Sequence, residues 1–137
     1  MILRVSTTTL AFLALSLPAL AEGDAEKGAK EFNKCKSCHA IVDPEGNAVV
    51  KGGKTGPNLW GIVGQTVGSV ADFKYGEDIV AVGAAGKVWD EAALVEYTKD
   101  PAAWLKAESG NDGAKSKMTF KLAKGNEDVA AYLATMQ

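Results

Sequence analysis

Apolar residues recur with a helical period in several short segments, and each segment is bounded by a residue typical of a helix end. Asp24 can cap a helix that runs from about Ala25 to Lys36. A shorter helix is predicted over residues 78–85, where Gly86 would end it. Gly28 lies inside the first helix and costs it ~1 kcal/mol relative to alanine, so a close contact with another helix is expected there.

Further helices are predicted in the second half of the chain. Asp90 can cap one, and Pro101 either ends that helix or begins a short one around Trp104. Asn126 can cap a last helix. The apolar face of this last helix consists of Val129, Tyr132, Leu133 and Met136.

Long irregular stretches connect these helices. Residues 43–68 are rich in Gly, Asn, Lys and Pro and show no sustained period, so we expect loops there with a short extended pair around 48–50. Residues 109–116 predict an exposed flexible loop. The result is an all-α fold of four to five short helices with long loops. Its apolar residues are too scattered to form a large core by themselves, which favours an embedded cofactor.

The N-terminal segment predicts export rather than part of the domain. An apolar run from Leu10 to Leu20 ends in small residues, which is typical of a secretory signal peptide over 1–21 that is removed after Ala21. A transmembrane anchor is the alternative, but it needs ~20 apolar residues, and this run is shorter and contains a serine and a proline. We therefore expect one mature domain over 22–137.

The charge balance excludes one class of partner. The chain has 15 Lys and Arg against 17 Asp and Glu, a formal net charge of −2. This balance is too weak and too mixed to indicate nucleic-acid binding.

The chemistry is concentrated at Cys35, Cys38 and His39, which form the sequence Cys-x-x-Cys-His. Two thiols one helical turn apart can both form thioether bonds with one porphyrin, and the next residue can place its imidazole beneath the iron. A disulfide or thioredoxin-like redox pair is an alternative, but that pair follows a strand, whereas this one follows a helix. Zinc would need four ligands, and the chain has one histidine and no further cysteine. The motif therefore favours haem c.

A single histidine also limits the second axial position, which must be water, vacant, lysine or methionine. Met1 would be removed with the signal peptide and Met136 lies at the end of the last helix, so Met118 is the favoured ligand. A thioether favours Fe(II) and closes the coordination shell. This favours an electron carrier over an enzyme such as a small haem peroxidase, or a nitric-oxide-binding protein, each of which needs an open site. A metal-free or zinc-bound structural module is a third alternative.

The mature chain resembles class I cytochrome c over nearly its whole length, and it is closely similar to the bacterial cytochrome c2 family. The resemblance implies the class I cytochrome c fold, with short helices and long loops around one covalently bound haem. Its markers are Cys35-Lys-Ser-Cys38-His39, Thr55-Gly56-Pro57-Asn58-Leu59, Trp89, Tyr97 and Lys117-Met118-Thr119-Phe120.

The resemblance also implies roles around the haem. The Pro57 carbonyl would accept a hydrogen bond from His39, and Tyr75 and Trp89 would bind a buried propionate. Gln65 stands where many relatives have an arginine, and the loss of that positive charge should lower the reduction potential.

Other implied contacts are further from the histidine. Tyr97 would lie near the methionine sulfur, and Thr119 follows the methionine on the same loop. Gly28, Phe32 and Tyr132 match the contact between the first and last helices.

As a function, the resemblance implies a soluble, monomeric, periplasmic carrier of single electrons. It would take electrons from a cytochrome bc1-type, quinol-oxidising complex and pass them to a photosynthetic reaction centre or a terminal oxidase. Lysines around the haem edge would steer transient docking onto acidic partner surfaces. These lysines are Lys34, Lys36, Lys54, Lys115, Lys117, Lys121 and Lys124.

Overall fold

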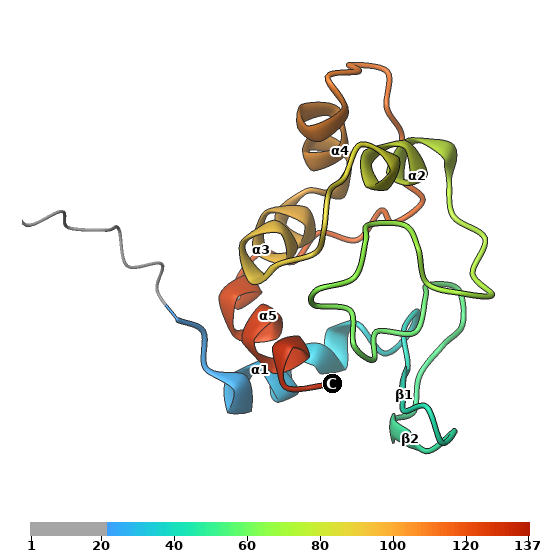
Figure 1. Cartoon of the computed structure of the whole chain (residues 1–137). Coiled ribbons are helices and arrows are strands. Elements are labelled where there is room, and N and C mark those ends of the chain that lie inside the picture. Colours follow the sequence, from blue (N-terminus) through green and yellow to red (C-terminus); the bar gives the residue numbers. More distant parts are fainter. Residues whose placement is uncertain (1–21) are drawn as a thin grey trace, which may run out of the picture.

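The computed structural model describes residues 22–137, and the predicted signal peptide over 1–21 lies outside the described residues. Helices dominate, in agreement with the predicted all-α class (Figure 1). In chain order the elements are α1 (Ala25–Glu31), the 3₁₀ helix η1 (Phe32–Lys34), β1 (Ile41–Val42), β2 (Ala48–Val50), α2 (Glu77–Ala84), α3 (Glu91–Lys99), α4 (Pro101–Ser109) and α5 (Asn126–Ala134).

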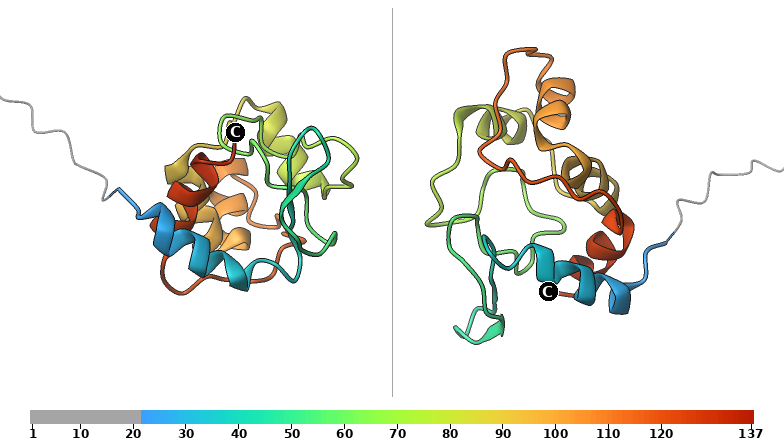
Figure 2. Two further views of the ribbon diagram at one scale, coloured as in Figure 1. Left: turned by 90° about the horizontal axis from the view of Figure 1, so that it is seen from below. Right: turned by 180° about the vertical axis from the view of Figure 1, so that it is seen from behind.

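Helices α1, α3 and α5 gather on one side of the molecule, and the long connection between β2 and α2 wraps around the other side (Figures 1 and 2). The strands β1 and β2 form a small antiparallel hairpin at one end of this connection, where the extended pair was predicted. Among the described residues, no helix is long and apolar enough to cross a membrane.

The packing of α1 against α5 joins the two ends of the described chain. Gly28 lies so close to α5 that a Cβ atom at this position would stand 1.9 Å from the backbone oxygen of Asp128. One turn further along, the rings of Phe32 and Tyr132 pack at a tilt with their centroids 5.7 Å apart. The backbone N–H of Asp24 donates to the Asp128 carboxylate over 2.7 Å. The predicted contact of Gly28 and Phe32 with the last helix is therefore present, and the close approach explains a glycine inside a helix.

The predicted first helix is too long. The α-helix ends at Glu31, a 3₁₀ turn covers the next three residues, and irregular turns follow up to His39. The Cys35 N–H donates to the Phe32 carbonyl over 2.8 Å, and the His39 N–H donates to the Cys35 carbonyl over 3.0 Å. The chain therefore tightens where the two cysteines and the histidine must face a common point.

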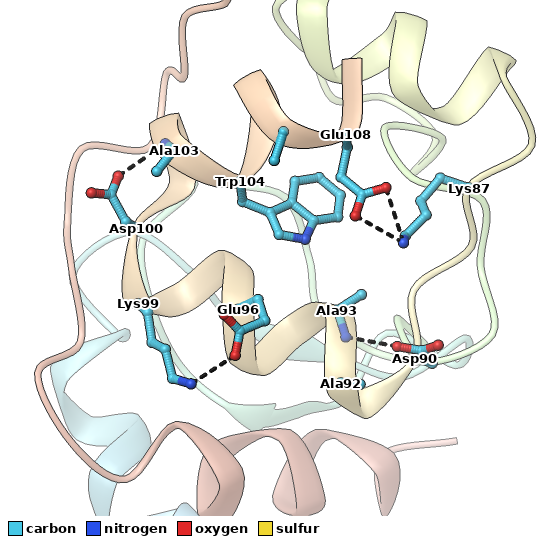
Figure 3. Close-up of a pocket in the computed structure, with 11 residues that line it drawn as sticks. Lys87, Asp90, Ala92, Ala93, Glu96, Lys99, Asp100, Ala103, Trp104 and Glu108 are labelled. Atoms are coloured by element: carbon cyan, nitrogen blue, oxygen red, sulfur yellow. Dashed lines mark hydrogen bonds and ion pairs between the residues drawn. The ribbon is translucent and has the colours of Figure 1, made fainter. Parts of the chain in front are cut away.

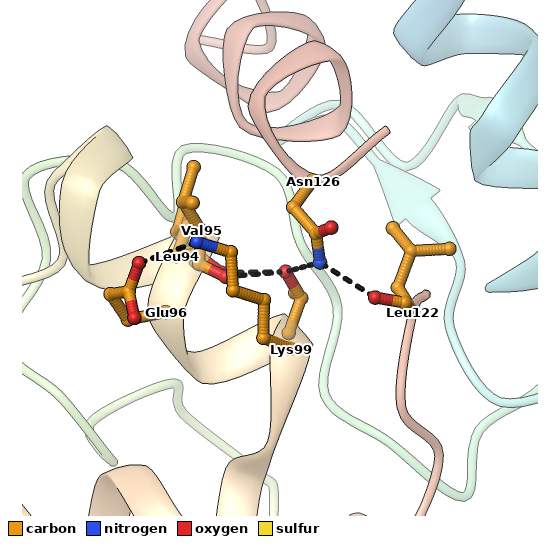
Figure 4. A network of polar contacts seen from close by, with 7 residues as sticks. Leu94, Val95, Glu96, Lys99, Leu122 and Asn126 are labelled. Atoms are coloured by element: carbon orange, nitrogen blue, oxygen red, sulfur yellow. Dashed lines mark hydrogen bonds and ion pairs between the residues drawn. The ribbon is translucent and has the colours of Figure 1, made fainter. Parts of the chain in front are cut away.

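The predicted cap of the last helix is also wrong. Gly125 occupies the N-cap position with φ of 81°, and Asn126 is the first helical residue. The Asn126 side chain is buried, and its amide donates to the Thr98 hydroxyl over 2.9 Å and to the Leu122 carbonyl over 3.0 Å (Figure 4). Asn126 therefore joins α3 to the start of α5 instead of capping its own helix.

The remaining helix boundaries lie close to those predicted. Helix α2 begins one residue earlier than expected and Asp90 caps α3, with its carboxylate accepting from the Ala93 N–H over 2.7 Å. Pro101 starts α4 rather than extending α3, because Asp100 between them adopts an extended conformation and caps α4. Residues 110–125 contain no helix or strand. The loop predicted over 109–116 therefore begins one residue late, because Ser109 ends α4, and it is not exposed throughout, since Ala114 is buried.

We predict that Gly28→Ala destabilises the protein by about 1–3 kcal/mol, because the added methyl group forces α1 away from α5. Helix propensity alone predicts the opposite, a gain of ~1 kcal/mol. Guanidinium unfolding of the haem-bearing protein measures the difference, with Ala29→Ser on the exposed side of the same helix as the control. A Gly28→Ala protein as stable as the wild type would contradict the close packing.

Candidate haem site

A cavity of about 350 Å³ lies between the helices and the long loops, and all of the predicted site residues line it. These residues are Cys35, Cys38, His39, Pro57, Tyr75, Trp89, Tyr97, Met118 and Thr119. Most of the remaining lining is apolar and comes from both ends of the chain, including Phe32, Leu94, Leu105, Val129 and Leu133. Segments far apart in the sequence thus converge on one apolar space.

The two cysteines have different environments at the edge of this cavity. Both are free, Cys35 half-buried and Cys38 exposed. Burial raises the pKa of the Cys35 thiol to about 11. Hydrogen bonds from the hydroxyls of Thr55 and Ser37 lower the pKa of Cys38. The turn presents both sulfur atoms to the same cavity, as attachment of one porphyrin through two thioethers requires.

His39 is held in one orientation by its neighbours. Its Nδ1 lies 2.8 Å from the Pro57 carbonyl, to which it donates, so Nε2 is left as the free ring nitrogen. Burial lowers the pKa of His39, which keeps the imidazole neutral and able to bind a metal. A Cβ on Gly56 would stand 2.4 Å from His39 Cε1, so the absence of a side chain leaves room for the ring.

Two hydroxyl groups in the cavity wall make no hydrogen bond of good geometry with the described residues, although the Val70 backbone lies near one and the Tyr97 side chain near the other. They belong to Tyr75 and Ser116, and both are fully buried. Burial also raises the pKa of Tyr75, so its hydroxyl stays protonated and can donate. Unpaired buried polar groups are rare in folded proteins, so these two hydroxyls indicate a polar ligand group in the cavity.

Sequence reasoning missed Ser116. A serine in a loop rich in Gly, Asn and Lys carries no signal of its own, because such residues are usually solvated. Its position two residues before Met118 is the one feature that could have drawn attention to it.

Aromatic side chains form the wall between the cavity and α4. The rings of Trp89 and Trp104 stack with centroids 5.1 Å apart, and Tyr97 packs edge-on against both. Burial raises the pKa of Tyr97. Trp89 and Tyr97 line the cavity, whereas Trp104 does not. Its contacts with both rings therefore hold the two predicted site residues in place on the side away from the cavity.

Gln65 stands outside the lining of this cavity. Its side-chain amide donates to the Gly61 carbonyl over 2.8 Å and so links the two ends of the turn over residues 61–65. The lower reduction potential expected from this position stays a prediction.

A second hollow, of about 500 Å³, lies between α3 and α4 on the outer surface and contains no predicted site residue (Figure 3). Its charged side chains already have partners. Lys87 pairs with Glu108 at 3.0 Å and Lys99 with Glu96 at 2.7 Å, while Asp90 and Asp100 cap the two helices. These groups stabilise the α3–α4 arrangement. Within residues 22–137, no group of three or more His, Cys, Asp or Glu side chains is placed to hold a metal.

Comparisons with known proteins identify the family. No family model matches the chain. Cytochrome c2 of Rhodobacter capsulatus is 54% identical over 134 residues, covering 98% of this chain and 97% of that protein. Cytochrome c-550 of Paracoccus versutus is 57% identical over 129 residues, covering 92% of this chain and 84% of that protein. The chain belongs to the cytochrome c2 family.

Solved structures of the family agree with the fold. The structure of cytochrome c2 from Rhodobacter capsulatus matches with a TM-score of 0.81 at 58% identity, covering 82% of this chain and 97% of that one. Ferric cytochrome c-550 from Paracoccus versutus matches with a TM-score of 0.82 at 55% identity, covering 84% of this chain and 98% of that one. The class I cytochrome c fold expected from the resemblance is therefore confirmed.

As a member of the cytochrome c2 family, the protein carries one covalently bound haem c with its iron, and it is an electron carrier rather than an enzyme. The cavity fits this cofactor. Its apolar lining suits a porphyrin face, the free cysteines stand at its edge, and the unpaired Tyr75 and Ser116 hydroxyls suit haem propionates.

We predict that Gly56→Ala lowers the yield of haem-bearing protein and destabilises it by about 1–3 kcal/mol, because the methyl group displaces the His39 ring. Haem content per polypeptide and guanidinium unfolding measure the two effects. Gly113→Ala is the control, since its Cβ would meet only the Asn111 side chain, at 3.2 Å. Equal behaviour of the two variants would show that Gly56 does not fix the imidazole.

Proposed function

We propose that the protein is an exported, periplasmic carrier of single electrons, whose haem iron is bound by His39 and Met118. The observation that carries this proposal is that these two residues, from opposite halves of the chain, line one cavity with both cysteines of the attachment motif. The bound haem supplies the one-electron Fe(III)/Fe(II) couple. The side chains around it supply attachment, ligation and insulation from water.

On one side of the cavity, Cys35 and Cys38 would hold the porphyrin through thioethers and His39 would bind the iron through Nε2. The Pro57 carbonyl fixes the imidazole through Nδ1 and increases its basicity as a ligand. Because attachment and ligation come from one five-residue turn, the iron has little freedom to move relative to the chain on this side.

On the other side, Met118 would supply its thioether sulfur. A soft sulfur ligand favours Fe(II) and raises the reduction potential relative to an all-nitrogen site. Tyr97 and Thr119 line the cavity with Met118 and would enclose the sulfur. A coordination shell closed in both oxidation states leaves no open position for oxygen or peroxide, which supports electron transfer rather than catalysis.

Polar groups in the wall would bind the propionates. Tyr75 and Ser116 line the cavity and have hydroxyl groups that can donate, and Trp89, the second donor of the predicted pair, lines the same cavity. A buried propionate carboxylate without such donors would cost several kcal/mol. Because the propionate charge acts on the nearby iron, donors that fix the propionate would also keep the reduction potential within a narrow range.

Partners would be membrane complexes reached by diffusion through the periplasm. The predicted signal peptide supports export, and by family resemblance the donor would be a cytochrome bc1-type complex and the acceptor a photosynthetic reaction centre or a terminal oxidase. Lys34, Lys115 and Lys117 are exposed and line the cavity. They would place positive charge at the haem edge, where it favours brief docking of a monomer onto acidic surfaces.

We predict that Met118→Leu abolishes the red absorption band of the Met-sulfur to Fe(III) bond and lowers the midpoint potential, because leucine offers no ligand atom. Met136→Leu is the matched control, since Met136 is the other methionine of the described chain. Visible spectroscopy of the ferric protein and voltammetry measure both. Retention of the band in Met118→Leu would assign the ligand to another residue, and its absence from the wild type would refute methionine ligation and leave water, a vacant position or lysine.

We predict that Lys115→Glu slows electron transfer with an isolated bc1-type complex or reaction centre several-fold at low ionic strength, and that added salt removes the difference. The ammonium group of Lys115 makes no ion pair within residues 22–137, so its reversal breaks none. The Lys115 N–H donates to the Asp78 carboxylate, so an unchanged midpoint potential of the variant serves as the check that the loop around Met118 is intact. Lys51→Glu carries the same charge change on the hairpin, away from the cavity lining. Equal rates for the two variants would argue against a docking role for the haem-edge lysines.

A further inference from the structure

The segment that carries Met118 has little secondary structure to hold it. Residues 110–125 connect α4 to α5 without helix or strand, and Lys115, Lys117 and Thr119 are exposed. An irregular surface segment of this kind opens easily unless specific contacts fix it. The contacts that fix it therefore decide how firmly Met118 is presented to the cavity.

The C-terminal side of this segment is anchored in the interior. The buried residue Leu122 donates its N–H to the Thr98 carbonyl over 2.8 Å and accepts from the Asn126 amide over 3.0 Å. Asn126 also bonds the Thr98 hydroxyl, so α3, α5 and this part of the segment form one network (Figure 4). An exposed ion pair between Lys121 and Asp100, at 2.6 Å, adds to this anchor.

The N-terminal side is anchored by the buried Ala114, whose N–H donates to the Asn111 carbonyl over 3.0 Å, and by one carboxylate at the next residue. Asp78, in the first turn of α2, accepts a hydrogen bond from the Lys115 N–H over 2.8 Å. Between Lys115 and Lys121, no other backbone group takes part in a hydrogen bond with the described residues. The Lys117 ammonium reaches the Lys74 carbonyl over 3.1 Å, but it does so through a long, exposed side chain.

Resting on the proposed role of Met118 as the iron ligand, we propose that Asp78 is a positioning residue for that ligand. Its carboxylate fixes the backbone one residue before Ser116 and three before Met118, so it sets how often the methionine loop leaves the cavity. Glu77 shares its helix turn and charge, but it makes no hydrogen bond with the loop. The tether therefore depends on the Asp78 acceptor atom and not on negative charge at the start of α2.

The test uses the ferric, haem-bearing protein and free imidazole, which binds the iron only when Met118 has left it. Asp78→Ala removes the acceptor, whereas Asp78→Asn keeps an oxygen acceptor and removes the charge. Glu77→Ala is the charge-matched control for Asp78→Ala. We expect Asp78→Ala to bind imidazole about fivefold more readily, the factor that corresponds to about 1 kcal/mol for one hydrogen bond. Asp78→Asn and Glu77→Ala should stay close to the wild type.

Amide hydrogen exchange and unfolding distinguish a local tether from a general loss of stability. Exchange at the Lys115 amide, which is the hydrogen-bonded one, should accelerate in Asp78→Ala, while its guanidinium midpoint stays close to that of Glu77→Ala. Equal imidazole binding by Asp78→Ala and Glu77→Ala would overturn the proposal, as would an Asp78→Asn protein that behaves like Asp78→Ala. A wild type without the Met–Fe(III) band would instead refute Met118 ligation itself.

Discussion

The folded chain depends on one apolar cavity whose walls come from every part of the described sequence. Phe32 and Cys35 reach it from the first helical segment, Leu94 and Leu105 from the middle, and Val129 and Leu133 from the last helix. Because these side chains face a shared space as well as one another, the haem completes the hydrophobic core. The same contacts that stabilise the fold therefore exclude water from the iron. A mutation in this lining is thus expected to change both the free energy of unfolding and the reduction potential.

The His39 side of this cavity is held more rigidly than the Met118 side. On one side of the cavity, a tight turn, the Pro57 carbonyl and the backbone of Gly56 hold His39 from several directions. On the Met118 side, the proposed methionine ligand lies on an irregular segment that is held at separated points. Protein interiors deform little where they are densely packed, so thermal opening is concentrated on the methionine side. If both residues bind the iron as proposed, the His39 contact is the more firmly held, and the Met118 contact is the one that mutation can adjust.

Much of this arrangement could be predicted from the sequence, because its signals are local or covalent. The motif at Cys35, the capping residues Asp24 and Asp90, and the costly glycine inside α1 each impose a constraint within a few residues. Features that depend on tertiary contacts could not be predicted. Asn126 was expected to cap its helix through its side-chain oxygen, yet Gly125 takes the N-cap position and the Asn126 amide N–H₂ donates inward to the Thr98 hydroxyl and the Leu122 carbonyl. Ser116 carried no signal because its burial is a property of the folded loop.

The unpaired hydroxyls of Tyr75 and Ser116 also bear on how the protein matures. A buried polar group without a partner costs ~1–3 kcal/mol, so closing the fold before a ligand group arrives carries this penalty twice. Protein stability is commonly only ~5–15 kcal/mol, which makes that penalty a substantial share. Before haem is attached, the chain is thus biased toward open conformations, in which the half-buried Cys35 is more accessible. Attachment of haem then closes the fold. The unpaired hydroxyl groups of the cavity wall therefore favour attachment first and closure second.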